Sequence, residues 1–446
     1  MLLRNKYLWF SIIFVVIQQV FLAISTYYIA MAGGNLSGNR VDEVLGYITL
    51  FFLFALGAYL FSSISEFTKL KLSNSLWESY SNGMYNKIKF NMPISANSNK
   101  KMVTNWLTGE APSTFKEVSS FVVEIVSLYC NVLFTLGIFF VTLGYILSSV
   151  MTISIFVSFF LIQVLRHKIN NYANNIQYSK LQLFVNINSI WDVFLFGNNR
   201  IITEKSAKFK IRANEYFKHS EKYMILEQFI ACFPVYFTLP LLMIIMYHLN
   251  TTNSLILGGF VAVLPRSLQL FGNVHSLSLY NSKIFFIRAK YKNLENFIDT
   301  IKKQDLLKQI KKAEITISNT QTQSRMHPDD LINLIKANKL RNGRICISGS
   351  NGVGKSSLLK ILKQFSSGDS VLIMPSVSFK DSTNDGSTGE EQLAQLYETL
   401  QINNQKLFLD EWDANLDYDN FKKINTLLDQ ISKEVLIIEI RHNKYT

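Results

Sequence analysis

The sequence predicts a chain of two parts: an α-helical membrane domain of six transmembrane helices at residues 1–298, and an α/β domain at residues 299–446. Three observations predict this fold class. Long apolar runs fill the first part, a glycine-rich loop lies between a short apolar strand and a helix in the second, and most basic residues lie between the apolar runs. A length of 446 residues leaves room for two or three domains.

The composition fits a membrane protein better than a nucleic-acid-binding protein. Hydrophobic residues make up 48% of the chain and charged residues 17%, whereas soluble domains are roughly 25% charged. The net charge of +13 would suit nucleic acid, but the basic residues lie in loops between apolar runs, as in positive-inside membrane proteins. We therefore expect lipid and no nucleic acid as a partner. Cys130, Cys232 and Cys346 have no disulfide or zinc spacing and are interpreted as small buried residues.

Six apolar stretches are expected to cross a bilayer. They cover about residues 8–32, 45–65, 121–147, 150–166, 228–248 and 254–272. The stretch 125–165 carries no charge and is too long for one helix, so we expect a tight turn near Ser148 and Ser149. The sixth span is the weakest, because Pro265 and Arg266 interrupt it.

The loop charges predict the orientation. Lysine and arginine gather in the loops at 66–118 and 167–225, and the N-terminus carries Arg4 and Lys6. In contrast, Arg40 is the only basic residue between the first and second spans. The two long loops, the N-terminus and the α/β domain are therefore expected in the cytoplasm.

The two long loops are predicted to be helices that continue beyond the membrane and reverse near residues 108–112 and 196–199. Each reversal is either a docking point for a cytoplasmic domain or a solvated helical hairpin. Residues 270–312 are expected to form a polar helical linker. Glu124 and Arg266 are charged residues at or within spans, and each either faces a cavity or a partner or lies at an interface.

The stretch 349–356 fits the P-loop pattern G-x-x-x-x-G-K-[ST], and its flanks read as a strand at 345–347 and a helix from 357. Glycines let backbone N–H groups form an anion nest at the helix N-terminus. Lys355 is expected to reach the β- and γ-phosphates, and Ser356 to ligate Mg²⁺. A glycine-rich turn with an incidental lysine is the alternative, which the flanks disfavour. The candidate nucleotide-binding residues here are Gly349, Ser350, Asn351, Gly352, Val353, Gly354, Lys355, Ser356 and Ser357.

Two later strands are predicted to complete the chemistry. The apolar strand from Lys406 ends in two carboxylates: Asp410 is expected to hold Mg²⁺ through water, and Glu411 to polarise the attacking water. The buried strand 435–440 is followed by His442, which at a strand's carboxyl end can contact the γ-phosphate. A lone surface histidine is the alternative. ATP and Mg²⁺ are thus the expected cofactors.

Over essentially its whole length the sequence resembles the ATP-binding cassette (ABC) transporters. Residues 387–392, Ser-Thr-Gly-Glu-Glu-Gln, look like their signature motif, and residues 410–417 look like a Walker B motif that continues into the D-loop. The combination of Ser-Thr-Gly with Asp-Glu-Trp is similar to the branch that exports cyclic peptides, microcin-like peptides and siderophore precursors.

The resemblance implies a half-transporter of the bacterial inner membrane, in which two copies form the pump and ATP is held between the P-loop of one copy and the signature of the other. It adds Ser387, Thr388, Gly389 and Asp417 to the nucleotide-binding residues and makes His442 the switch histidine. The two cytoplasmic reversals would be the coupling helices.

The cassette departs from the family's pattern. Only residues 357–386 separate the P-loop from the signature, too few for most of the usual helical subdomain. Ser376 stands where the Q-loop glutamine is expected, and no aromatic residue for stacking on adenine occurs between Phe297 and the P-loop. Within the signature region Gly386 replaces leucine and Glu390 replaces glutamine.

Two hypotheses therefore remain open. The first is an ATP-driven exporter of a peptide or siderophore-like compound that works as a homodimer, or as a heterodimer whose partner supplies the missing parts. The second is a degenerate ABC membrane protein that binds nucleotide without pumping, as a sensor, immunity factor or partner subunit. A carrier driven by an ion gradient would need more ionisable groups within the spans.

Overall fold

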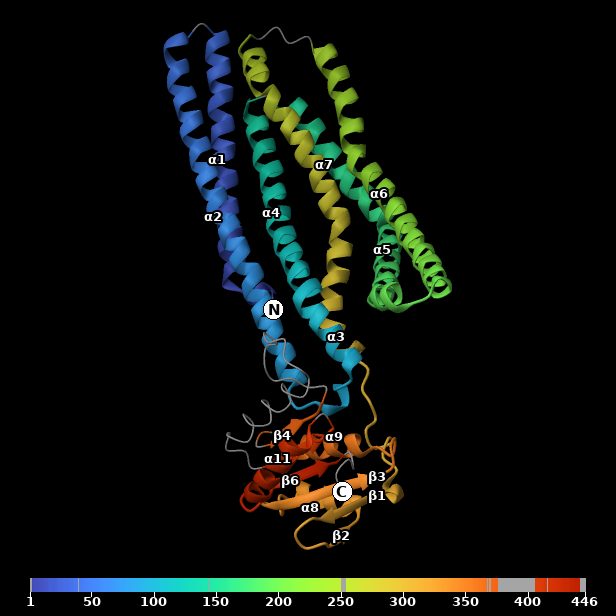
Figure 1. The fold of residues 1–446 in the computed structure, drawn as a ribbon. Coiled ribbons are helices and arrows are strands. Elements are labelled where there is room, and N and C mark those ends of the chain that lie inside the picture. Colours follow the sequence, from blue (N-terminus) through green and yellow to red (C-terminus); the bar gives the residue numbers. More distant parts are fainter. Residues whose placement is uncertain are drawn as a thin grey trace. The chain divides into compact units, whose positions relative to one another are not determined.

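The structure, a computed structural model, describes residues 2–38, 40–142, 144–249, 254–366, 368, 370–375, 406–414 and 416–441. Its internal contacts divide the chain into two compact units (Figure 1). The helical unit comprises Met1–Asn82 and Asn105–Ile298, and the sheet unit comprises Gly83–Thr104 and Asp299–Thr446. A piece of the first predicted cytoplasmic loop therefore belongs to the sheet unit.

Long helices make up the helical unit. The α-helices up to residue 296 are α1 (Lys6–Ser37), α2 (Val41–Ile88), α3 (Asn97–Asn105), α4 (Ala111–Thr142), α5 (Tyr145–Phe196), α6 (Asn199–Leu249) and α7 (Ser254–Asn296). Of these, α3 up to Thr104 and the last turns of α2 belong to the sheet unit, as does the turn η2. Short turns of other helix types are η1 (Leu2–Arg4), η2 (Met92–Ile94), the π-helix η3 (Trp106–Glu110) and η4 (Phe297–Thr300). Helices α1, α4 and α7 pack together, and α5 runs along α6 (Figure 1).

Within the described residues, four helices are long and apolar enough to cross a membrane: Lys6–Ser37, Val41–Ile88, Asn97–Thr142 and Asn199–Leu241. These helices contain the whole of the first and second expected spans. They also contain most of the third and most of the fifth expected span. The fourth and sixth expected spans lie in α5 and α7, so a total of six remains a prediction.

Polar side chains on different helices of the helical unit bond to one another. Asn131 on α4 donates from Nδ2 to Oε1 of Gln19 on α1 at 2.6 Å, and Asn273 on α7 donates to Oδ1 of Asn131 at 2.6 Å. Glu124 accepts from the Tyr280 hydroxyl and lies 3.4 Å from Nζ of Lys69. Amide and carboxylate groups on apolar helices need such partners, because lipid offers none. Of the two alternatives for Glu124, the structure shows the one with partners.

Two predicted turns are misplaced. The turn between the third and fourth expected spans lies not at Ser148 and Ser149, which are inside α5, but between the end of α4 at Thr142 and the start of α5 at Tyr145; the φ of +82° at Gly144 suits glycine alone. The first predicted reversal is not at 108–112 either: α2 ends at Ile88, and the chain turns through η2 before α3. Pro112 lies where the π-helix η3 passes directly into α4, so its missing N–H falls at this change of helix type and does not end the helix. The second reversal, at 197–198 between α5 and α6, is confirmed.

The sheet unit is built on a six-stranded mixed sheet of order β2-β1-β3-β6-β5-β4. Its strands are β1 (Ile315–Asn319), β2 (Arg325–Met326), β3 (Gly343–Gly349), β4 (Ser370–Ile373), β5 (Lys406–Asp410) and β6 (Leu436–Ile440). Strands β3, β6, β5 and β4 are parallel, whereas β1 is antiparallel to β2 and β3. Its helices are α8 (Pro328–Lys336), α9 (Lys355–Ser366) and α11 (Tyr418–Ile431), with the 3-10 turn η5 (Lys312–Glu314).

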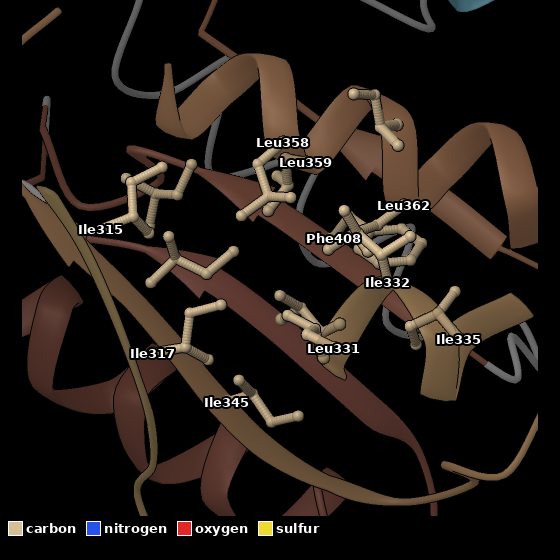
Figure 2. Packing of buried hydrophobic residues seen from close by; sticks show 14 of the residues in the cluster. Ile315, Ile317, Leu331, Ile332, Ile335, Ile345, Leu358, Leu359, Leu362 and Phe408 are labelled. Carbon is tan, nitrogen blue, oxygen red and sulfur yellow. The ribbon is translucent and has the colours of Figure 1, made fainter. Parts of the chain in front are cut away.

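Two apolar clusters cover the two faces of this sheet. On one face, residues of β1, β3 and β5 such as Ile317, Ile345 and Phe408 meet residues of α8 and α9 such as Leu331 and Leu358 (Figure 2). On the other face, alternate residues of β5 and β6 pack with α11. The period of two in each strand sends neighbouring side chains to opposite faces. The P-loop strand β3 is held in the sheet by Ile345 and Ile347, which lie in the cluster on the α8 and α9 side.

The predicted strands at 345–347, 406–411 and 435–440 correspond to β3, β5 and β6, and the predicted helix after the P-loop is α9. The predicted helical linker to residue 312 is wrong beyond Thr300, because residues 302–311 form no helix. The sequence reading also missed β1, β2 and α8. The start of α8 carries a readable signal: Pro328 is in its first turn, and Asp329 and Asp330 follow.

Candidate nucleotide-binding site

Three parallel strands bring the predicted site residues to one edge of the sheet. In the pairing register Ile347 of β3 is opposite Ile440 of β6, and Ile440 is opposite Asp410 of β5. The P-loop begins two residues after Ile347, so it and Asp410 leave the sheet at the same edge. Ligands of open α/β sheets bind outside the carboxyl ends of the strands. The residues that the sequence predicts to bind phosphate and metal therefore lie at the edge where a ligand is expected.

The P-loop folds into a tight turn between β3 and α9. Gly354 has φ +92°, and a Cβ built on it would lie 2.3 Å from the carbonyl oxygen of Gln309, so both its backbone angle and its surroundings require glycine. Val353 is 1% exposed and anchors the turn in the core, while Ser350 and Asn351 are exposed. Lys355 Nζ donates to the carbonyl of Gly349 at 2.7 Å across the loop. The lysine side chain is thus directed across the loop that is predicted to bind phosphate.

The linker before β1 packs on the P-loop from outside. Lys311 N donates to the carbonyl of Val353 at 2.9 Å, and Ser357 Oγ donates to Oε1 of Gln309 at 2.8 Å. Ser357 was predicted to contact the nucleotide; in this structure its hydroxyl bonds to the linker. Both bonds lie inside the sheet unit, so the loop is held by contacts within its own unit.

Ser356 and Asp410, the two predicted Mg²⁺ ligands, are neighbours. The Ser356 side chain is close enough to lower the pKa of the Asp410 carboxyl, and Asp410 is only 4% exposed. Its Oδ1 has no hydrogen-bond partner among the described residues. Burial raises the pKa of Asp410, the Ser356 hydroxyl lowers it, the Glu411 charge raises it, and Lys360 and Lys355 lower it; the net direction is upward. A hydroxyl beside a buried carboxylate oxygen without a partner fits a small divalent cation that keeps several waters.

This donor set differs from a dedicated metal cage. Within the ranges that the structure describes, no group of three or more His, Cys, Asp or Glu side chains could hold a metal ion. Mg²⁺ in nucleotide sites uses one or two protein ligands, with substrate phosphates and water as the others. The arrangement fits that kind of site.

Glu411 follows Asp410 in a strained turn. Its φ is +47°, which is uncommon for a residue with a side chain, and its N–H donates to the carbonyl of Ile440 at 2.9 Å. Trp412, the next residue, is 1% exposed and stacks on Phe421 of α11 at 5.6 Å between ring centroids. Glu411 is partly exposed, and two features restrain it: the hydrogen bond of its own backbone N–H to Ile440 and the buried side chain of the next residue, Trp412.

Of the remaining predicted site residues, the structure describes Asp417 alone. Asp417 is the N-cap of α11 and accepts from N of Asn420 at 2.8 Å and from Nδ2 of the same residue at 3.1 Å. Ser387, Thr388, Gly389 and His442, together with Ser376, lie outside the described residues. Their roles stay predictions.

The segment at 83–104 packs within the same sheet unit. Met92 contacts the apolar cluster beneath α9, Gln304 N donates to the carbonyl of Pro93 at 2.8 Å, and Asn99 Nδ2 donates to that of Lys302 at 2.9 Å. A cavity of about 530 Å³ lies between this segment, α9 and β4; its lining includes Phe90, Met92, Lys100, Lys360, Lys363 and Met374. The first reversal is therefore a docking point in this unit and no solvated hairpin.

These features define a class of protein: a P-loop-type α/β unit with a candidate site for a nucleoside triphosphate and Mg²⁺, in a chain with long apolar helices. No protein-family model matches the chain, and no curated protein matches its sequence. Among solved structures the chain is similar to a bacterial Atm1-family ABC exporter with ATP bound. The TM-score is 0.62 at 12% identity, over 97% of this chain and 91% of that one.

At this identity the likeness establishes the fold. The chain has the fold of an ABC exporter, as the sequence resemblance predicted, and with its apolar helices it is a membrane protein. The fold does not identify the substrate branch, the size of the nucleotide-binding domain or the number of copies in the assembly.

Proposed function

We propose that this chain is an ATP-driven membrane exporter that works as a dimer with ATP at the interface between two cassettes. The observation that carries the proposal is the buried oxygen of Asp410, which has no partner among the described residues and lies at the sheet edge where the P-loop begins. A purely structural carboxylate at that depth would be expected to have its acceptors filled. The exporter fold over nearly the whole chain supports the same conclusion.

The described residues divide the work at this site. The P-loop backbone and Lys355 would bind the phosphates, and Lys355 would exchange the Gly349 carbonyl for a phosphate oxygen. Ser356 and Asp410 would hold Mg²⁺, which neutralises charge on the phosphates when it is bound. Glu411 would orient the attacking water and accept its proton. His442 and the Ser387–Gly389 segment of the second copy would complete the site, as the family resemblance implies.

Coupling to the membrane helices would run through the 83–104 segment. Its first residues end α2, and its turn packs on α9, the helix that begins at Lys355. A change at the P-loop can therefore act on α2 through Met92 and its neighbours without the usual helical subdomain. The sequence predicts that most of the usual helical subdomain is missing; the packing of Met92 on the sheet unit supports a shorter connection.

The test is ATP hydrolysis by the purified full chain in lipid. We expect Mg²⁺-dependent hydrolysis that falls at least a hundredfold in Glu411→Gln and Lys355→Ala, since each removes a group that acts in the transition state. Glu411→Gln should still bind ATP, whereas Lys355→Ala should bind it more weakly. Wild-type activity no higher than that of Glu411→Gln would contradict the proposal and would favour a membrane protein that binds nucleotide without pumping.

For the substrate we propose a peptide or siderophore-like compound, exported from the cytoplasm across a bacterial inner membrane. This rests on the Ser-Thr-Gly signature and the Asp-Glu-Trp motif at 410–412. ATP-dependent uptake of a cyclic peptide into inside-out vesicles, absent in Glu411→Gln, tests it. Uptake of neither cyclic peptides nor siderophore precursors by a chain that hydrolyses ATP would refute the substrate class alone. Mass measurement of the purified protein tests the homodimer.

A further inference from the structure

Glu439 is a carboxylate in the middle of the apolar strand β6, and it is 0% exposed. Its Oε1 accepts from Nε of Arg344 at 2.9 Å and from Nε of Arg441 at 2.9 Å. Its Oε2 accepts from NH2 of Arg344 at 2.9 Å and from Nε1 of Trp412 at 3.0 Å. A carboxylate offers about four acceptor sites, so each is filled by a residue of the chain.

Arg344 on β3 is equally well paired. It is 1% exposed, and its NH1 donates to Oδ1 of Asp429 at 2.6 Å and to the carbonyl of Asn425 at 3.2 Å. Its NH2 also donates to Oδ1 of Asn425 at 2.8 Å. With the two bonds to Glu439, the five donors of the guanidinium are used. This network is therefore complete without any ligand.

A buried ion pair adds little stability over well-packed apolar residues. A reason for keeping this one lies in the groups it orients. Trp412, the fourth donor to Glu439, directly follows Glu411, and the backbone of Glu411 is bonded to Ile440, which directly follows Glu439. Both restraints on Glu411 therefore come from adjacent residues of β6, and together they maintain its φ of +47°.

We infer that the hydrogen bond from Trp412 to Glu439 positions Glu411 for hydrolysis, which makes Trp412 and Glu439 positioning residues of this reaction. The inference rests on the proposed role of Glu411. The indole N–H is held by the carboxylate of Glu439, and the ring stacks on Phe421 as part of the apolar core. Loss of the N–H bond leaves the ring packed but removes its link to β6, and the strained turn at Glu411 can then relax.

The experiment compares Trp412→Phe with Phe421→Leu in the full chain in lipid. Trp412→Phe removes the N–H and keeps an aromatic ring, so we expect kcat to fall roughly tenfold, as for loss of a hydrogen bond to a charged group. KM for ATP and the affinity for a non-hydrolysable ATP analogue should not change, because the P-loop does not touch the network. Phe421→Leu removes the stacking ring and keeps the hydrogen bond, so kcat should stay near wild type even where thermal stability falls.

Glu439→Gln supplies a second variant of nearly the same size. Its amide can serve only some of the four donors, so we expect a loss in kcat at least as large as in Trp412→Phe. Wild-type kcat in Trp412→Phe would overturn the inference. So would a fall in kcat that follows thermal stability equally in Trp412→Phe and Phe421→Leu, since that pattern marks a structural role. If wild type hydrolyses no faster than Glu411→Gln, the proposed function itself fails, and the inference fails with it.

Discussion

Glu439 and Asp410 are buried carboxylates on neighbouring strands of one sheet, and their surroundings differ. Glu439 faces α11 and has four donors, two of them from a buried arginine. Asp410 lies at the carboxyl edge beside Ser356, and one of its oxygens has no partner in the described part of the chain. Burial costs each group its hydration. For Glu439 the protein compensates that cost, whereas at Asp410 part of the compensation is left to a ligand.

The comparison separates two uses of buried charge. A carboxylate whose acceptors are filled fixes the protein groups around it and should stabilise the fold as long as its partners stay in place. A carboxylate with a free oxygen beside a phosphate-binding loop is suited to a cation, and should destabilise the fold until the cation binds. The two groups should therefore respond to substitution with opposite signs.

The largest expected effect is at Glu439. Glu439→Leu leaves Arg344 buried with half of its charge partners, so we expect a loss of about 3–5 kcal/mol of stability. Thermal unfolding of the full chain in detergent, without nucleotide, measures it. The matched control is the double variant Arg344→Met with Glu439→Leu, which replaces the whole buried pair by apolar groups and should recover most of the loss. A double variant as unstable as the single one would show that the ion pair itself is not what matters.

The opposite sign is expected at Asp410. Because burial raises the folded-state pKa of Asp410 above its unfolded value, its contribution is fully favourable only below the unfolded pKa. It is lost as the pH rises through the folded-state pKa. At neutral pH the ionised group therefore destabilises the fold, and Asp410→Asn should raise the unfolding temperature in the absence of Mg²⁺.

Mg²⁺ with ATP sharpens this prediction. The ligands should stabilise the wild type more than Asp410→Asn, since a neutral amide is a weaker ligand for a hard cation. Unfolding temperatures with and without MgATP, at neutral pH, give both comparisons in one experiment. If Asp410→Asn unfolds at a lower temperature than wild type without ligands, then Asp410 is a structural group like Glu439 and the candidate cation site is wrong.

The sequence predicted the elements that carry the P-loop and the two acidic strand ends, because each is an apolar run that stops at a polar group. It could not predict the Arg344–Glu439 pair. These residues are 95 positions apart, and their contact depends on the register between β3 and β6, which a single sequence does not display. Strand β2 was missed because it has only two residues, whereas β1 does alternate, with Ile315 and Ile317 buried on either side of the exposed Thr316, and could have been predicted.

The first reversal was misplaced for a different reason. Gly109 and Pro112 are strong turn signals, but a π-helix and the first turn of α4 accommodate them. The actual turn begins at Phe90, a bulky residue with φ +59°, where local preference argues against a turn. The position of the turn is set by tertiary packing. Met92 packs on the core of the sheet unit, and Pro93 and Asn99 bond to the linker.

The smallest expected effect is at a third carboxylate, Asp417, which is exposed and caps α11 through two hydrogen bonds to Asn420. Asp417→Ala removes the cap and should cost about 1 kcal/mol, whereas Asp417→Asn, which caps equally well, should leave stability unchanged. Since both oxygens of Asp417 already accept bonds from Asn420, we expect kcat of Asp417→Asn to stay near wild type. A large fall in kcat of Asp417→Asn at unchanged stability would instead place this carboxylate in the nucleotide site, as the family resemblance predicts. The asparagine variant thus separates the charge of Asp417 from its cap, which the alanine variant alone would confuse.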